Sequence, residues 1–213
     1  PMKDSGVEWI GEIPEHWAVL PTKAVLKEVD RRSGDGQHEL LTVSHKSGVI
    51  PRTGADVTMF EAESYERHKV CREGEVVVNT MWAWMGGVGV SDRTGMVSPS
   101  YNVYSPRSTR LLPGFYECLC RIPPYVASMR SRSKGIWRSR LRLYPKSFLE
   151  IPLPIPPRDE QKRIEAHCDQ ESRVGRKVGA RITHAISLLQ EYRTALISAA
   201  VTGKIDVRDK VAA

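Results

Sequence analysis

The sequence predicts an α+β protein, in which a globular mixed α/β domain over residues 1–157 precedes a long C-terminal helix and tail over residues 158–213. Residues 1 to about 157 carry short apolar runs separated by Gly, Pro, Ser and Asp. Residues 159 to about 201 contain no proline and repeat apolar residues with a helical period. The chain has 213 residues, 40% of them hydrophobic and 27% charged, which is enough to bury a core and too apolar for a disordered segment.

Short apolar and β-branched runs predict the strands of the first domain. They lie at residues 39–43, 75–79, 96–98 and 101–104, and Gly-containing turns are expected at 34–36, 46–48 and 92–95. Residues 114–121 are expected to form a helix, and a second helical turn follows Pro123 and Pro124. Strands mixed with short helices predict an α+β domain of about 150 residues.

Residues 151–157 read IPLPIPP and separate the two parts of the chain. Proline fixes φ near −65° and has no N–H to donate to a β-ladder. We therefore expect an extended, stiff connector at this point.

The second part reads as one helix of about 60 Å, at about 1.5 Å per residue. Asp159 and Glu160 lie in its first turn, where the helix dipole favours acids, and Gly203 is a plausible stop. Apolar residues at steps of three and four form a stripe that one small domain cannot cover, so we expect pairing with another helix. The alternative is two shorter helices folded back at Gly175 or Gly179. The residues expected on the partner face are Ile164, Val178, Ile182, Leu189, Tyr192 and Leu196.

The basic charge is concentrated in one stretch. The chain has a formal net charge of +7, yet residues 118–149 alone contain eight Lys or Arg and no acid. A strand would place the arginines from 130 to 142 on one face, whereas Lys134 and Gly135 favour a loop. A basic run is often only a solvated face, but the absence of balancing acids favours contact with phosphates, and nucleic acid is the commonest anionic partner.

Two further segments are candidates for reading bases. Asn79, Thr80 and Trp82 combine short hydrogen-bonding side chains with an aromatic ring, and residues 44–48 form a polar loop that closes at Arg52. The glycines at 86–89 lack the spacing of a phosphate-binding loop and indicate a tight turn. The candidate DNA-binding residues are Ser44, His45, Lys46, Arg52, Asn79, Thr80, Trp82, Arg130, Arg132, Lys134, Arg138 and Arg140.

No residue pattern for catalysis is found in the sequence. The four cysteines lack zinc-finger spacing, so we expect free thiols in a reducing compartment and no metal site. Methyltransferase, metal-dependent nuclease, hydrolase and P-loop signatures are missing, which predicts a non-catalytic chain. No leader and no apolar run of 18 residues is seen, and the expectation is a cytoplasmic protein.

Several segments, taken in order, resemble the specificity subunits of type I restriction-modification enzymes. Residues 6–17 read GVEWIGEIPEHW, and residues 79–86 and 97–101 fit N-x-M-x-A-W-x-G and V-S-P-x-Y. Residues 133–136 with Arg138, the IPLPIPPRDEQ segment at 151–161, and residues 191–197 and 200–207 complete the resemblance. The matches span nearly the whole chain, and their combination is specific.

The resemblance implies sequence-specific recognition of double-stranded DNA. In the family, a specificity subunit carries two target-recognition domains and two helices that pair antiparallel as a spacer. Modification subunits dock alongside, and a restriction subunit can join them. S-adenosylmethionine, Mg and ATP are then expected only on those partner subunits, and none on this chain.

This chain carries one such domain and one such helix. Two copies are therefore expected to pair through residues 159–201 and to read an inverted repeat with a spacer. The alternative is a truncated product whose other half lies elsewhere. A coiled-coil interaction scaffold without a nucleic-acid role is the competing class, and an RNA binder is a weaker one, because no stacking pair of the RNP type is seen.

Overall fold

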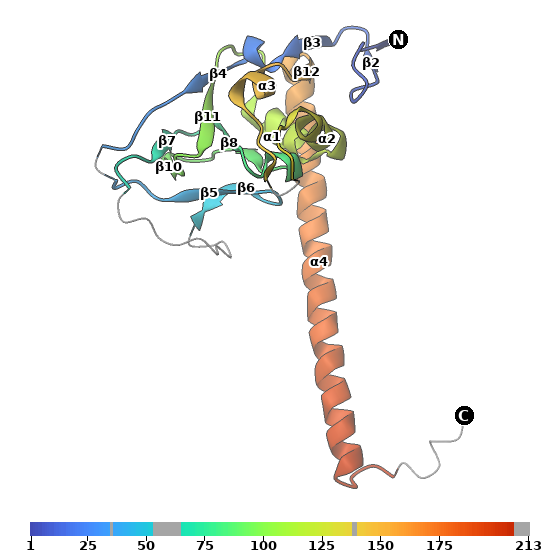
Figure 1. The fold of residues 1–213 in the computed structure, drawn as a ribbon. Coiled ribbons are helices and arrows are strands. Elements are labelled where there is room, and N and C mark those ends of the chain that lie inside the picture. The colour runs from blue at the N-terminus through green and yellow to red at the C-terminus, as the bar shows by residue number, and fades with distance from the viewer. Residues whose placement is uncertain (35, 53–64, 138–139, 207–213) are drawn as a thin grey trace. The chain divides into compact units, whose positions relative to one another are not determined.

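The structure is a computed structural model and describes residues 1–34, 36–52, 65–137 and 140–206. It divides into two compact units, Pro1–Glu165, which we call the head, and Ala166–Ala213, and each is described by itself. The expected fold class is confirmed, because sheets and short helices are followed by one long helix (Figure 1).

A four-stranded antiparallel sheet lies at the centre of the head. Its strand order is β4 (Leu26–Val29), β11 (Tyr101–Pro106), β8 (Val76–Asn79) and β9 (Val88–Val90). The strands expected at 75–79 and 101–104 are thereby confirmed. Every residue of β8 is buried, so the sheet is covered on both faces.

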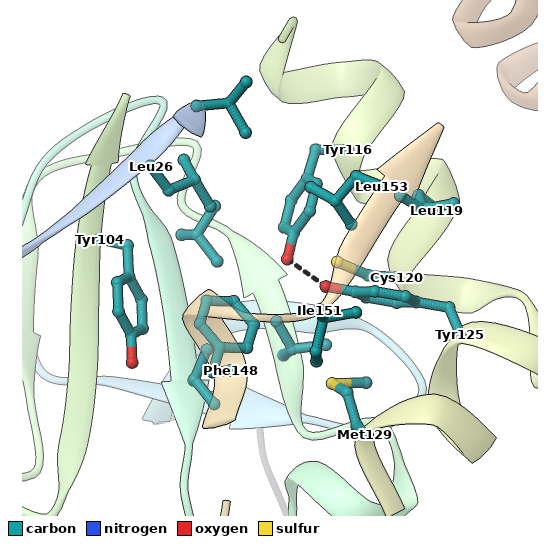
Figure 2. Close-up of a cluster of buried hydrophobic side chains, with 14 of the residues drawn as sticks. Leu26, Tyr104, Tyr116, Leu119, Cys120, Tyr125, Met129, Phe148, Ile151 and Leu153 are labelled. Atoms are coloured by element: carbon teal, nitrogen blue, oxygen red, sulfur yellow. Dashed lines mark hydrogen bonds between the residues drawn. The ribbon is translucent and has the colours of Figure 1, made fainter. Parts of the chain in front are cut away.

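Three helices and an aromatic cluster cover one face of the sheet. They are α1 (Pro113–Arg121), α2 (Pro123–Arg132) and α3 (Pro145–Leu149), and each begins with proline, whose missing N–H costs nothing in the first turn. Figure 2 shows Tyr104 beside Phe148, with ring centroids 4.6 Å apart, and the hydroxyls of Tyr116 and Tyr125 hydrogen-bonded at 2.6 Å. The helix expected at 114–121 is confirmed, and the expected second turn is a full helix, α2.

One β-hairpin and one further antiparallel pair of strands cover the other face. They are β5 (Leu41–Ser44) with β6 (Gly48–Pro51), and β7 (Lys69–Cys71) with β10 (Gly95–Val97). Their buried side chains form a second cluster with Val77 and Val103 of the sheet. The strands expected at 39–43 and 96–98 are found here, within a residue or two of the expected positions.

Gly89 allows the β5–β6 hairpin to lie against the sheet. A Cβ at Gly89 would lie 2.8 Å from the Cα of Gly48 and 3.0 Å from the amide nitrogen of Val49, which are backbone atoms. Gly89→Val is therefore expected to push the hairpin off β9 and to destabilise the head by about 1–3 kcal/mol, the usual cost of overpacking. Urea denaturation would measure this change. Gly34→Val, at a glycine with nothing within 4 Å, is the control and should have little effect.

The proline segment is a paired strand rather than a connector, which corrects the sequence expectation. Residues Pro152–Ile155 form β12, antiparallel to β3 (Ala18–Pro21), and Leu153 and Ile155 are buried in the core. Prolines alternate with apolar residues in β12. The N–H groups of Leu153 and Ile155 can therefore face β3, while the prolines occupy positions that need no donor. The smaller elements of this region are β1 (Met2–Asp4), β2 (Glu12–Pro14) and the 3₁₀ turn η1 (Thr22–Ala24).

The long helix α4 (Arg158–Val201) is continuous, so the alternative of two folded-back helices is wrong. Its first turns belong to the head. Gln161 is fully buried there, donates to the carbonyls of Arg110 and Pro156, and accepts from the amide of Leu112. Lys204 donates its N–H to the carbonyl of Ala199 after the end of the helix, where Gly203 has φ +71°, which confirms the expected stop.

Ile164 has a different role from the one expected. It was placed on the face that binds a partner helix, but it is half-buried and packs against the core of the head. The N-terminal segment also holds this part of α4, because Glu160 accepts from the indole of Trp17 at 2.8 Å and bonds His16 at 2.6 Å. These contacts explain why glutamate and glutamine follow the proline segment.

Beyond the head, α4 exposes a broad apolar surface. Leu189 is 66% exposed and Tyr192 is 63% exposed, and both lie on the predicted stripe. The sequence prediction omitted five further exposed apolar residues of this segment, which are Val174, Ile186, Leu188, Ile197 and Val201. In the described part of the chain, no helix is both long and apolar enough to cross a membrane.

Buried His68 is expected to make the stability of the head depend on pH. Burial lowers the pKa of His68 from its ordinary value of 6.5, and the charge of Arg52 adds to this, whereas a hydrogen bond to the backbone of Tyr65 opposes it. The unfolded chain therefore binds the proton more readily. The contribution of His68 to folding is complete above pH 6.5 and is lost as the pH falls below that value.

The measurement is urea denaturation at pH 7.5 and at pH 5.5. His68→Phe should show a smaller loss of stability than the unchanged protein, and the exposed His38→Gln should behave like the unchanged protein. An equal loss in His68→Phe would mean that other groups, such as carboxyls, set the pH dependence.

Candidate nucleic-acid interface

Three segments of the head meet at one place, although the sequence predicts them as separate surfaces. They are the turn of the β5–β6 hairpin (44–48), the segment 79–86 that contains the 3₁₀ turn η3 (Ala83–Met85), and the basic segment 130–142 without 138 and 139. We call them together the loop cluster. Some side chains of the loop cluster are bonded within the protein, and the others are free to contact a ligand.

Arg121 joins the hairpin turn to the η3 segment. Its guanidinium donates to the carbonyl oxygens of His45 at 3.4 Å, Gly86 at 3.5 Å and Val88 at 2.8 Å. The carboxylate of Glu117, four residues earlier on α1, accepts from the same guanidinium and from the amide of Val90. Arg121 belongs to the acid-free basic stretch 118–149, but its side chain binds backbone atoms of the head and has a structural role.

Asn79 has an internal role, which corrects the prediction that it reaches a base edge. It is 5% exposed; its Nδ2 donates to the hydroxyl of Tyr101 at 3.0 Å, and its Oδ1 accepts from the amide of Met81 at 3.3 Å. Both ends of the amide are thus occupied by the protein. Asn79 shapes the turn that presents its neighbours. Thr80 is half-buried, and its hydroxyl donates to the carbonyl of Ser100.

Trp82 is 50% exposed, and its ring stacks on that of Trp84 at 6.2 Å with an angle of 16°. Trp84 is buried and donates its indole N–H to the carbonyl of Met81. The guanidinium of Arg130 lies 5.8 Å from the centre of the Trp84 ring, within the range of a cation–π contact. Trp82 is therefore an exposed aromatic surface on a rigid support.

The basic segment is neither one strand nor one flat face. Arg130 and Arg132 end helix α2, and Arg132 bonds the hydroxyl and carbonyl of Ser128. Lys134 and Arg142 then exchange both backbone hydrogen bonds at 2.9 Å, which closes a loop over 134–142. The amide of Leu143 bonds the carbonyl of Thr80, so the loop is tied to the η3 segment. Arg138 lies outside the described residues.

Three cations of this loop face solvent. Lys134, Arg140 and Arg142 are exposed, and within the described part of the chain none of them makes an ion pair. Unpaired cations close together in sequence, without acids between them, produce a positive local potential that attracts phosphates.

The hairpin turn presents His45 and Lys46 to solvent. Ser44 Oγ accepts from the amides of Lys46 and Ser47, at 3.1 and 3.3 Å, and is used within the turn. Arg52 was expected to close this loop, but it follows the opposite end of the hairpin, where its amide bonds the carbonyl of Leu40. Arg52 therefore lies outside the loop cluster.

The described residues contain no group of three or more His, Cys, Asp or Glu able to hold a metal ion. Cys71 and Cys120 are buried, and burial raises the pKa of both thiols, so these sulfurs stay protonated near neutral pH. The surface of the loop cluster can supply cationic, hydroxyl, imidazole and aromatic contacts, which are the contacts that nucleic-acid readers use.

No family model matches the chain, and no curated protein matches it. Solved structures do. One match is a chain from a study of complex assembly and conformational transition of the type I R-M system, at 17% identity and a TM-score of 0.62. That match covers 93% of this chain and 48% of the other. Another is the HsdS subunit from Thermoanaerobacter tengcongensis, at 18% identity and a TM-score of 0.50, covering 81% of this chain and 40% of that one.

The first match covers nearly all of this chain, and the chain spans less than half the length of each of the two structures. At 17% and 18% identity, these matches show a shared fold. The protein has the fold of one half of a type I restriction-modification specificity subunit.

Proposed function

We propose that the chain recognises a sequence in double-stranded DNA as the specificity subunit of a type I restriction-modification assembly. It would direct methylation and cleavage by partner subunits and carry out no chemistry itself. S-adenosylmethionine, Mg and ATP would bind those partners. The observation that carries this proposal is the loop cluster, in which unpaired cations, an exposed tryptophan and a polar hairpin turn adjoin one another on the head.

The side chains of the loop cluster divide into two groups by chemistry. His45, Lys46 and Trp82 are exposed on two adjoining turns, and they are the candidates for contacts to base edges. Lys134, Arg140 and Arg142, with Arg138 between them in sequence, are the candidates for phosphate contacts that fix the orientation of the protein. Arg130 and Arg132, bound to Trp84 and Ser128, would add charge at the edge.

The helix beyond the head would pair with a second copy. Residues 1–157 would then be the DNA-recognition domain, and 158–213 the spacer and dimerisation element. The exposed apolar residues of α4 support this arrangement, because such a surface is normally covered in a soluble assembly. A two-fold dimer would read two half-sites in inverted orientation.

The test is binding of the purified chain to duplex DNA, alone and with its modification subunit, over a range of salt concentrations. Fluorescence anisotropy should show binding that weakens linearly in a plot of log K against log salt. Selection from a random duplex library should return a defined sequence. Self-association without duplex binding at low ionic strength would instead favour the interaction scaffold.

A further inference from the structure

The tip of the 134–142 loop exposes two large apolar side chains. Ile136 is 95% exposed and Trp137 is 67% exposed. Ile136 is the most exposed large apolar residue in the described part of the chain, and it lies in the head, far in sequence from the apolar stripe of α4. Ile136 adds nothing to the core, and with Trp137 next to it in sequence it forms an exposed apolar pair, which is more informative than a single exposed residue.

Backbone contacts join the two arms of the loop on either side of residues 138 and 139, which lie outside the described residues. Lys134 and Arg142 pair their backbones at its base, and the amide of Arg140 donates to the carbonyl of Trp137 at 2.8 Å near the tip. At Gly135 the two arms approach so closely that a Cβ would lie 2.7 Å from the carbonyl oxygen of Arg140. The described parts of the two arms are therefore held close together.

The surroundings of the tip indicate what it meets. The arms carry Lys134, Arg140 and Arg142, all exposed, and the acid-free stretch extends from residue 118 to 149. A protein partner would have to cover these cations together with the apolar tip. A nucleic acid satisfies both at once, because phosphates neutralise the arms and the flat faces of the bases are apolar.

We propose that Ile136 and Trp137 act as a wedge that enters the bound duplex between neighbouring base pairs and partly unstacks them. Proteins that bend DNA insert apolar side chains in this way, and the cost of unstacking is offset by contacts that the bent duplex gains. The wedge would also contribute to sequence preference. Base-pair steps that unstack easily need less free energy to open, so the protein would bind duplexes with such steps more tightly. This inference rests on the proposed DNA recognition and assigns to the same surface a way of distorting its ligand.

Unstacking by a wedge also untwists the duplex, which is measurable without knowing the recognised sequence. A closed circular plasmid is relaxed by a topoisomerase in the presence of the purified full chain, and the topoisomers are separated on a gel. The unchanged protein is expected to shift the topoisomer distribution in proportion to the amount bound. Ile136→Ser with Trp137→Ala should abolish the shift at equal occupancy and weaken duplex affinity about tenfold, as loss of one stacking contact does.

The matched control is Ile122→Ser, an exposed apolar residue between α1 and α2 that lies outside the loop. It should shift the topoisomers as the unchanged protein does. Both variants alter surface side chains, and circular dichroism checks that each remains folded.

The other outcomes would overturn the wedge and separate it from the proposed function. Duplex binding by the unchanged protein without any topoisomer shift would remove the wedge and leave DNA recognition in place. A full shift by the double variant would do the same. A double variant with normal DNA binding and topology that fails to bind the modification subunit would make the tip a protein contact. No duplex binding by the unchanged protein would remove both proposals.

Discussion

Replacing Lys134, Arg140 and Arg142 together by alanine is expected to weaken binding to every duplex, whatever its sequence. These three side chains are exposed and unpaired within the described residues, and they lie on one closed loop. Each phosphate contact that is lost removes about 0.9 from the slope of log K against log salt. Loss of three charge-assisted contacts should lower the affinity at low salt by roughly a hundredfold or more.

The control for this variant removes the same charge from another part of the head. Lys3, Lys27 and Arg72 are exposed and lie outside the loop cluster, so their triple alanine variant should keep most of the affinity and the salt slope. If the two triple variants weaken binding equally, the general charge of the protein attracts DNA and the loop has no special role. A change at Trp82 or His45 should behave differently from both, because it should alter which sequence is preferred.

Only some elements of the head were predictable from the sequence, and the way the strands pair was not. Short runs of apolar, aromatic and β-branched residues predicted the positions of β5, β8, β10 and β11, because burial on a pleated surface selects such residues locally. The pairing of β12 with β3 joins residues more than 130 positions apart. Proline in a segment usually indicates that the segment is not a paired strand. Only the position of β3 beside β12 shows that the prolines of β12 occupy places where no N–H donor is needed.

The sequence predicts which kinds of side chain the loop cluster contains, but it does not predict how they are arranged in space. Composition alone separated the acid-free stretch from the rest of the chain, and five of its described cations are exposed, which are Arg130, Lys134, Arg140, Arg142 and Lys146. Composition could not show that Arg121 is used internally, although Glu117 at the i−4 position of the same helix was a usable signal. Asn79 carried no such signal, because its partner Tyr101 belongs to another strand.

The same difference between local and distant contacts applies to the long helix. Its length and continuity followed from the absence of proline and the regular apolar period. The assignment of Ile164 was wrong because a repeat gives the face of a helix and does not say what covers each part of it. The first turns pack on the head, and the repeat continues unchanged into the exposed part.

Leu189→Glu is expected to abolish pairing of two copies through α4. Leu189 is exposed in the single chain and lies on the apolar stripe, with Ile182 seven residues before it and Leu196 seven residues after it. In a two-helix coiled coil such a position is buried against the partner. Each copy would lose a buried leucine worth about 2 kcal/mol and bring a carboxylate into the seam, so the dimer should weaken by roughly a thousandfold or more.

Sedimentation velocity at micromolar concentration measures this change, and Thr194→Glu is the matched control. Thr194 lies on the same helix, away from the three- and four-residue steps that define the stripe, and the substitution adds the same charge. The control should remain dimeric. A dimer links two half-site readers, so Leu189→Glu should also lose the affinity gained on duplexes with two half-sites and keep the affinity for one. A monomeric unchanged protein would show that something other than a second copy covers the stripe. An equally strong dimer of Leu189→Glu would place the contact on another face of α4.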